Sequence, residues 1–128
     1  VILVQKEVAE RIIARDGKES ILSISVKAYG TPRIVSIVKA GSFVPAPSID
    51  SAILAIEHIS KKMFSGVSEE TFFSLMKAGF AHKRKRLAGN VKSMLPTIDK
   101  TLELLGINPD VRPEELPVEA WFKLAKTK

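Results

Sequence analysis

"SFVPAPSIDSA", residues 42–52, connects two runs rich in β-branched and aliphatic residues, "RIVSIVKAG" at 33–41 and "SAILAIEHI" at 51–59. Both runs predict strands. Pro45 and Pro47 each fix φ at about −65° and donate no hydrogen bond, so the connector is stiff and extended and cannot pair as a central strand. The second run is apolar on both faces, which predicts that its strand lies centrally in a sheet.

The connector also carries a large aromatic residue, Phe43. Two interpretations stay open from the residues alone. Phe43 either plugs the core or presents its ring for stacking on a planar base, a contact worth about 1–3 kcal/mol per base. The simplest interpretation of Asp50 and Ser51 is a turn before the second strand, with local bonds from side chain to backbone.

The pattern before residue 42 alternates strand and helix. Residues 1–4 predict a buried strand, and apolar residues at helical spacing predict a helix over 6–14, ended by Asp16-Gly17. Ser20 is a suitable cap for a second helix, although the alternation that follows it also permits a strand. Gly30, Thr31 and Pro32 form a breaker before the strand at 33–41.

The character of the chain changes at residues 61–68, and everything beyond predicts helices. One long helical stretch covers 69–95 with Ser68 as its N-cap, a shorter helix covers 97–105 and ends at Gly106, and a third lies within 113–125. Trp121 and Phe122 are expected in the core of these helices. The sequence thus predicts two domains, residues 1–64 and 65–128.

The long helical stretch is strongly basic, because no acidic residue lies between Thr71 and Thr97. Its cations are Lys77, Lys83, Arg84, Lys85, Arg86 and Lys92. Its apolar residues share one sector of a helical wheel, so that this face should pack on a core. Lys83 falls inside that sector, which requires its side chain to snorkel or the helix to bend near Gly79 or Gly89. The charges form either a solvated face or a surface for phosphates.

The composition agrees with a phosphate-bearing partner, because 20 Lys and Arg against 14 Asp and Glu give a net charge of +6. Cysteine is absent and the two histidines are far apart in the sequence, so no metal site is expected. The apolar runs are too short to span a bilayer, and a cytoplasmic protein without membrane contact is predicted. A β-rich run that starts at Val1 without a turn predicts a fragment of a longer chain.

Four segments resemble the ribosomal RNA adenine dimethyltransferases in order and spacing. They are "VQKEVAERI" at 4–12, "FVPAPSIDSAI" at 43–53, "FAHKRKRLAGNV" at 80–91 and "LGINPDVRPEELPVEAWFKLA" at 105–125. The most specific are the F-x-P-x-P-x-[IV]-D-S motif and the R-P-E-E-L segment with its following tryptophan. The resemblance implies the C-terminal part of an α/β Rossmann-like methyltransferase domain, followed by a small all-α domain that binds RNA.

The resemblance further implies transfer of methyl groups from S-adenosylmethionine to the exocyclic nitrogens of two adjacent adenines near the 3′ end of small-subunit ribosomal RNA, as a step in maturation of that subunit. A target base must leave its stack to be reached. By resemblance, Phe43 is the catalytic-site aromatic that stacks on the adenine. The implied RNA-binding residues are Lys83, Arg84, Lys85, Arg86 and Lys92. A monomer is expected.

The chain departs from the family pattern because the glycine-rich cofactor loop, the acidic residue for the cofactor ribose and the N-[LIP]-P-Y motif are not among its residues. The S-adenosylmethionine site is therefore expected upstream, and these 128 residues alone are expected to be inactive. Three alternatives stay open: a large-subunit methyltransferase of the resistance type, a non-catalytic RNA-binding or ribosome-assembly module of the same fold, and a basic domain that binds proteins.

Overall fold

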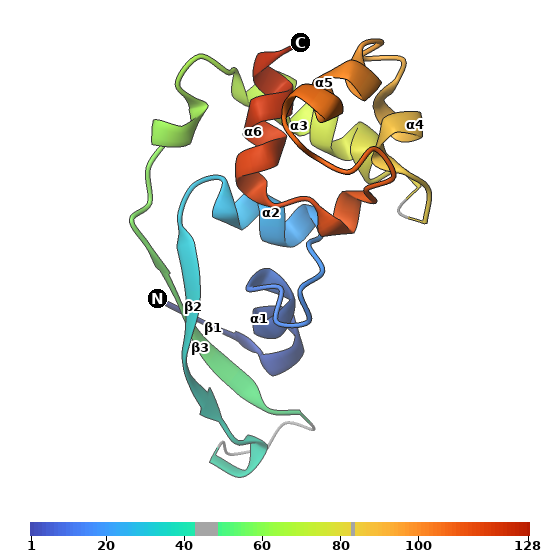
Figure 1. Cartoon of the computed structure of the whole chain (residues 1–128). Coiled ribbons are helices and arrows are strands. Elements are labelled where there is room, and N and C mark those ends of the chain that lie inside the picture. The colour runs from blue at the N-terminus through green and yellow to red at the C-terminus, as the bar shows by residue number, and fades with distance from the viewer. Residues whose placement is uncertain (43–48, 83) are drawn as a thin grey trace.

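The computed structural model describes residues 1–42, 49–82 and 84–128, and its strands lie in the first half of the chain (Figure 1). The elements of that half are β1 (Ile2–Gln5), α1 (Lys6–Ile12), α2 (Ile21–Lys27), β2 (Thr31–Val38) and β3 (Ser51–Glu57). The α-helices that follow are α3 (Glu69–Gly79), α4 (Leu87–Val91), α5 (Ile98–Leu104) and α6 (Val118–Lys126). Short 3-10 turns at Ala40–Ser42, Lys62–Phe64 and Pro113–Glu115 complete the described elements.

The sheet has the order β1-β3-β2, and β3 is antiparallel to both neighbours. The prediction of a central strand for the run at 51–59 is therefore confirmed. The breaker predicted at 30–32 is wrong for two of its residues, because Thr31 and Pro32 belong to β2 and face Glu57 and Ile56 of β3. Pro32 is tolerated because β2 lies at the edge of this sheet, where one side of the strand needs no hydrogen bonds.

One small core lies between α1 and the sheet. Ala9 and Ile12 of α1 are buried in one cluster with Ala52 and Leu54 of β3. The alternation of β3 thus places every second side chain against α1, as a strand requires. At the opposite edge from β2, the β1 residues Ile2 and Leu3 are 48% and 54% exposed.

The helix at α2 is confirmed over the alternative strand by its cap. Ser20 Oγ accepts a hydrogen bond from the Ser23 N–H at 3.1 Å, and Ser23 Oγ accepts one from the Ser20 N–H at 2.8 Å. This reciprocal pair satisfies two N–H groups of the first turn. Ile24 of α2 and Ala28, the residue after its end, are buried in one cluster with the later helices, so α2 lies between the sheet and those helices (Figure 1).

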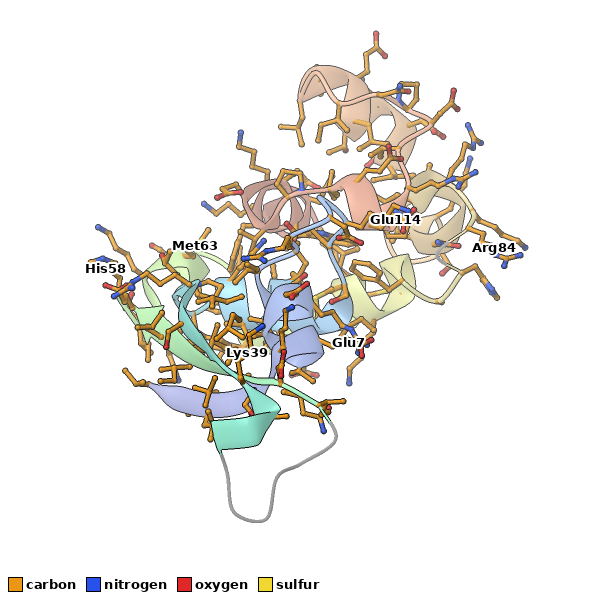
Figure 2. The ribbon with its side chains drawn as sticks, turned by 90° about the horizontal axis from the view of Figure 1, so that it is seen from below. Glu7, Lys39, His58, Met63, Arg84 and Glu114 are labelled. Atoms are coloured by element: carbon orange, nitrogen blue, oxygen red, sulfur yellow. The ribbon has the colours of Figure 1, made fainter. Side chains whose placement is uncertain are left out.

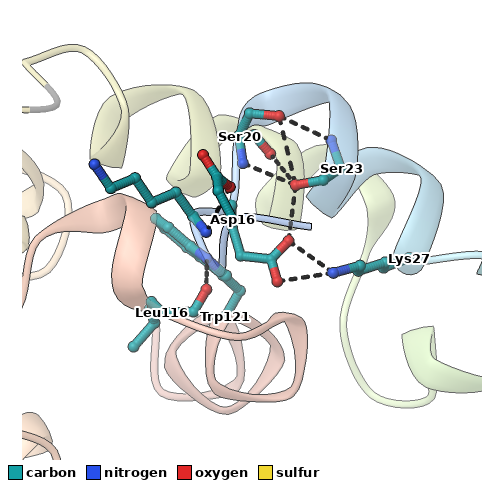
Figure 3. Close-up of polar contacts among 8 residues, drawn as sticks. Asp16, Ser20, Ser23, Lys27, Leu116 and Trp121 are labelled. Atoms are coloured by element: carbon teal, nitrogen blue, oxygen red, sulfur yellow. Dashed lines mark hydrogen bonds and ion pairs between the residues drawn. The ribbon is translucent and has the colours of Figure 1, made fainter. Parts of the chain in front are cut away.

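A polar network fastens the start of α2 to the segment before α6. The Glu19 carboxylate accepts hydrogen bonds from Ser23 Oγ at 2.8 Å and from Lys27 Nζ at 2.8 Å, and Figure 3 shows Ser23 and Lys27 converging on it. The Glu19 backbone N–H donates to the Glu114 carbonyl at 2.8 Å. The division of the chain at residue 65 stays a prediction, because α2 shares a core with the second half.

The larger core is built around α3 and α6. Trp121 is fully buried, and its indole N–H donates to the Leu116 carbonyl at 3.1 Å (Figure 3). Phe122 stacks on Phe72 of α3 with ring centroids 4.3 Å apart. The prediction that Trp121 and Phe122 belong to the helical core is confirmed. The caps at Ser68 and Gly106 are also confirmed, since Ser68 Oγ accepts from the Thr71 N–H at 3.0 Å and Gly106 has a positive φ of 71°.

A single helix over 69–95 is wrong. The α3 helix ends at Gly79, and α4 starts only at Leu87, so a turn separates them. Of the two alternatives that the position of Lys83 left open, a snorkelling side chain or a bend near Gly79 or Gly89, the structure shows an interruption of the helix at Gly79. None of the helices in the described part of the chain is long and apolar enough to cross a membrane.

Candidate nucleic-acid interface

Arg84, Lys85 and Arg86 lie on the turn between α3 and α4, of which residues 80–82 and 84–86 are described and which we call the basic turn. The end of α3 packs against Trp121. A Cβ atom at Gly79 would lie 2.4 Å from Trp121 Cη2, so only glycine allows α3 to approach α6 this closely. Phe80, the next residue, stacks on the Trp121 indole with ring centroids 5.3 Å apart. The beginning of the basic turn is thus fixed against a fully buried ring.

The side chain of Asn90 closes the basic turn from α4. Its amide nitrogen donates to the Gly79 carbonyl at 2.8 Å and to the His82 carbonyl at 3.0 Å. Carbonyls at a helix C-terminus have no partner within the helix, and this amide satisfies one of them at the end of α3. The Lys85 N–H also donates to the His82 carbonyl, at 2.9 Å. One side chain therefore joins α3, the turn and α4.

The end of the basic turn is anchored on the segment before Pro113. Leu87 is fully buried, and its N–H donates to the Val111 carbonyl at 2.8 Å. Arg86 Nη1 lies 3.0 Å from Asp110 Oδ1. Both ends of the turn are consequently held by buried residues, while the cationic side chains described between them face solvent.

The structure sorts the predicted RNA-binding cations by their partners. Arg84, Lys85, Arg86 and Lys92 are all exposed, and Figure 2 shows Arg84 projecting outward from the turn. Arg86 pairs with Asp110, and Lys92 Nζ lies 3.5 Å from Asp99 Oδ2. Within the described residues, Arg84 and Lys85 have no carboxylate at ion-pair distance. Lys83 lies outside the described residues.

The connector that carries Phe43 is described only at its base, and Phe43 itself lies outside the described residues. At that base, Asp50 Oδ1 accepts a hydrogen bond from the Ala40 N–H at 2.9 Å, and Lys39 Nζ lies 3.6 Å from Oδ2. The Asp50 carbonyl accepts from the Lys6 N–H at 3.0 Å. The prediction that Asp50 makes only local bonds in a turn is therefore incomplete. Asp50, the residue before β3, also bonds to Ala40 just after β2 and to Lys6 at the start of α1.

These contacts also change the acidity of Asp50. The hydrogen bond from the Ala40 N–H is the main cause that lowers the pKa of this carboxyl below its ordinary value, and the charges of Lys39 and Lys6 lower the pKa further. Partial desolvation opposes the shift. Asp50 is thus an ionised carboxylate at neutral pH that ties together the two ends of the connector.

Sequence reasoning missed Asn90 and Asp110. The sequence contains only a weak indication of a role for Asn90: asparagine is a poor helix former, and it stands in a segment whose pattern predicts a helix. Asp110 pairs with a residue 24 positions away, and no local pattern indicates such a pair. Both residues became apparent only when α4 and the segment before Pro113 were placed beside the basic turn.

The described residues do not fit an S-adenosylmethionine site. The seven glycines lie at least ten positions apart, so they form no glycine-rich loop. The cleft beside α1 is lined by charged side chains alone: Glu7, Glu10, Arg11, Arg15, Asp16 and Lys18. Pockets for such cofactors are mostly apolar with a few polar groups. In the described part of the chain, no group of three or more His, Cys, Asp or Glu residues is arranged to hold a metal ion.

A sheet covered by α1, a helical region and an exposed basic turn place the chain among mixed α/β proteins with a cationic surface. The chain belongs to the ribosomal RNA adenine dimethylase family, whose model matches residues 1–128. It is 43% identical over 128 residues to ribosomal RNA small subunit methyltransferase A of Dehalococcoides mccartyi strain CBDB1 and 37% identical over 134 residues to the protein of that name from Streptococcus uberis. The alignments cover 97% and 98% of this chain but only 44% and 46% of those relatives, so the chain spans less than half their length.

Two solved structures resemble the fold. A dimethyladenosine transferase from Plasmodium falciparum matches with a TM-score of 0.76 at 27% identity, over 95% of this chain and 54% of that one. The 23S rRNA methyltransferase ErmE matches with a TM-score of 0.70 at 18% identity, over 97% of this chain and 52% of its own. At that identity the second likeness concerns the fold alone.

Proposed function

We propose that this chain is the C-terminal portion of an enzyme that dimethylates two adjacent adenines near the 3′ end of small-subunit ribosomal RNA. Family membership and 43% identity to a small-subunit methyltransferase support the reaction class and the substrate. The reaction would be a step in maturation of the small subunit. The helical part, residues 65–128, is the RNA-binding domain in this proposal, and the protein acts as a cytoplasmic monomer.

The observation that carries the RNA-binding part is the exposed basic turn. Arg84 and Lys85 are exposed and adjacent in the sequence, and neither has a carboxylate at ion-pair distance among the described residues, whereas Arg86 and Lys92 of the same surface each have one. Phosphates are the partners that unneutralised cations on a rigid turn attract. Arg86 extends this surface along the turn, and Lys92 extends it to the end of α4. We include Lys83 among the RNA-binding residues from its place in the basic sequence.

We assign adenine stacking to Phe43. An adenine must leave its stack before its exocyclic nitrogen can be methylated, and a ring at the end of a stiff connector is suited to hold the extruded base. Asp50 supports that role by holding the base of the connector through Ala40. S-adenosylmethionine supplies the methyl group, and its binding site belongs to the part of the enzyme that precedes these residues.

The experiment is a methylation assay with the full-length protein, S-adenosylmethionine and small ribosomal subunits whose adenines are unmethylated. Mass spectrometry of the RNA should find two methyl groups on each of two adjacent adenines. Methylation of large-subunit RNA instead would identify the resistance type. RNA binding without methyl transfer would identify an assembly module, and absence of RNA binding would leave a basic domain that binds proteins.

A further inference from the structure

We propose that Asn90 is a positioning residue that holds the basic turn in the conformation in which Arg84 and Lys85 meet RNA phosphates. This inference rests on the proposed function, because it concerns the same RNA surface. Asn90 does not contact the phosphates in this scheme. It acts through the two cations, whose backbone it holds in place.

The geometry favours a positioning role because the Asn90 amide is fully used. Its NH₂ group has two hydrogens, and the structure provides two acceptors, the carbonyls of Gly79 and His82, at 2.8 and 3.0 Å. The remaining polar atom is a carbonyl oxygen, which repels a phosphate. Asn90 therefore has no donor left for RNA, while its bonds span the end of α3 and the middle of the turn.

Asn90 can hold the turn because α4 is itself held by the core. Leu87, three residues before Asn90, and Val91, the residue after it, are fully buried. The Leu87 N–H is also bonded to the Val111 carbonyl. The Asn90 side chain is short and has few rotamers. Because α4 is fixed against the core, the two hydrogen bonds of Asn90 hold the basic turn in a fixed position relative to the core.

A fixed turn favours binding because the cationic side chains of a mobile turn would have to become ordered when they bind phosphates. Ordering mobile groups on binding lowers affinity, and a preorganised surface avoids that loss. Without the Asn90 bonds, Arg84 and Lys85 keep their charge but sample more positions. We expect a three- to tenfold loss of RNA affinity, on the order of what immobilising one or two long side chains costs.

The test uses the full-length protein and a synthetic 3′-terminal fragment of small-subunit RNA, with affinity measured over a series of salt concentrations. Asn90→Ala and Asn90→Asp should both weaken binding, because both lose the amide donors. Asn90→Gln keeps an amide and should restore part of the affinity. Ser93→Ala, an exposed neighbour beyond α4, is the matched control and should bind as the unmodified protein does. Thermal unfolding of each variant checks that it is folded at the assay temperature.

A double-mutant cycle decides whether Asn90 acts through the cations. In a background of Arg84→Gln with Lys85→Gln, Asn90→Ala should cause no further loss. If Asn90→Ala lowers affinity in that background as much as it does in the unmodified protein, the inference is wrong. It is also wrong if the folded Asn90→Ala protein binds RNA with unchanged affinity. Weakening by Asn90→Asp but not by Asn90→Ala would also overturn it, because it would reveal a charge effect only. If Arg84→Gln with Lys85→Gln alone leaves binding unchanged, the assignment of the RNA surface fails as well.

Discussion

Asp50 and Ala40 are joined by a hydrogen bond of 2.9 Å from the Ala40 backbone N–H to the Asp50 carboxylate, across the base of the connector that carries Phe43. The bond joins the residue before β3 to a residue just after β2, ten positions apart in the sequence. The Asp50 carbonyl also accepts from the Lys6 N–H. Asp50 therefore joins the described residues on both sides of the connector to each other and to the start of α1.

The Asp50 bond should make stability depend on acid. Its folded-state pKa is lowered, chiefly by the Ala40 N–H, so its contribution is present above the unfolded pKa of about 3.9 and is lost as the pH falls through the lower folded value. We expect the difference in urea midpoint between the unmodified protein and Asp50→Asn to shrink below about pH 4. A difference that is the same at neutral and acid pH would show that the charge of Asp50 is not involved.

Two glycines offer a matched pair for packing. Gly79→Ala should lower the free energy of unfolding by about 1–3 kcal/mol, because the new methyl group would overlap Trp121. Gly89→Ala should raise it by about 0.4–1 kcal/mol, because Gly89 lies in α4 with open space around it and alanine limits the unfolded chain. Urea denaturation of both variants measures the two effects. Equal effects would contradict the close approach of α3 to α6.

The cations of the basic turn should contribute to the salt dependence of RNA binding. Replacing Arg84 and Lys85 by Gln should weaken binding and flatten the slope of log affinity against log salt by about one for each phosphate that is no longer neutralised. Lys100→Gln with Lys126→Gln removes the same charge from exposed sites elsewhere and serves as the control. If the control flattens the salt slope by the same amount, the effect depends on the net charge of the protein and not on the position of Arg84 and Lys85.

In the proposed complex Asp110 would compete with an RNA phosphate for Arg86, because Asp110 Oδ1 lies 3.0 Å from Arg86 Nη1. Asp110→Asn should therefore strengthen RNA binding about two- to fivefold at low salt, the gain expected when an exposed ion pair worth up to about 1 kcal/mol no longer has to be broken. Asp99→Asn, which frees Lys92 in the same way, is the comparison. Unchanged affinity in Asp110→Asn would place Arg86 away from the RNA.

Phe43 should matter more for methyl transfer than for binding. In the full-length enzyme, Phe43→Ala is expected to lower the rate of methylation much more than it lowers affinity for the small subunit, because stacking concerns the single extruded adenine. Rates and affinities are measured on the same particles. Parallel losses in both would return Phe43 to the interpretation in which it plugs the core.

Several features of this protein follow from local sequence. The central position of β3 follows from its two apolar faces, the start of α2 from the Ser20 cap, and the end of α5 from Gly106. The family was also apparent in the sequence, because its motifs are short and their spacing is kept. Each of these signals depends on residues that are neighbours along the chain, so propensity, capping and alternation are enough to read them.

The tertiary structure alone decided the rest. Wheel geometry continued one helix through Gly79, whereas α3 ends at that residue, which packs so closely on Trp121, 42 positions later, that a Cβ would have no room. The number of cations in the sequence did not distinguish Arg84 from Arg86. The two differ because Arg86 forms an ion pair with Asp110, which is distant in the sequence. The sequence also did not indicate Asn90, because its side chain bonds to the carbonyls of Gly79 and His82, which lie outside α4. Contacts between distant residues are set by packing, and packing has no signature in a local pattern.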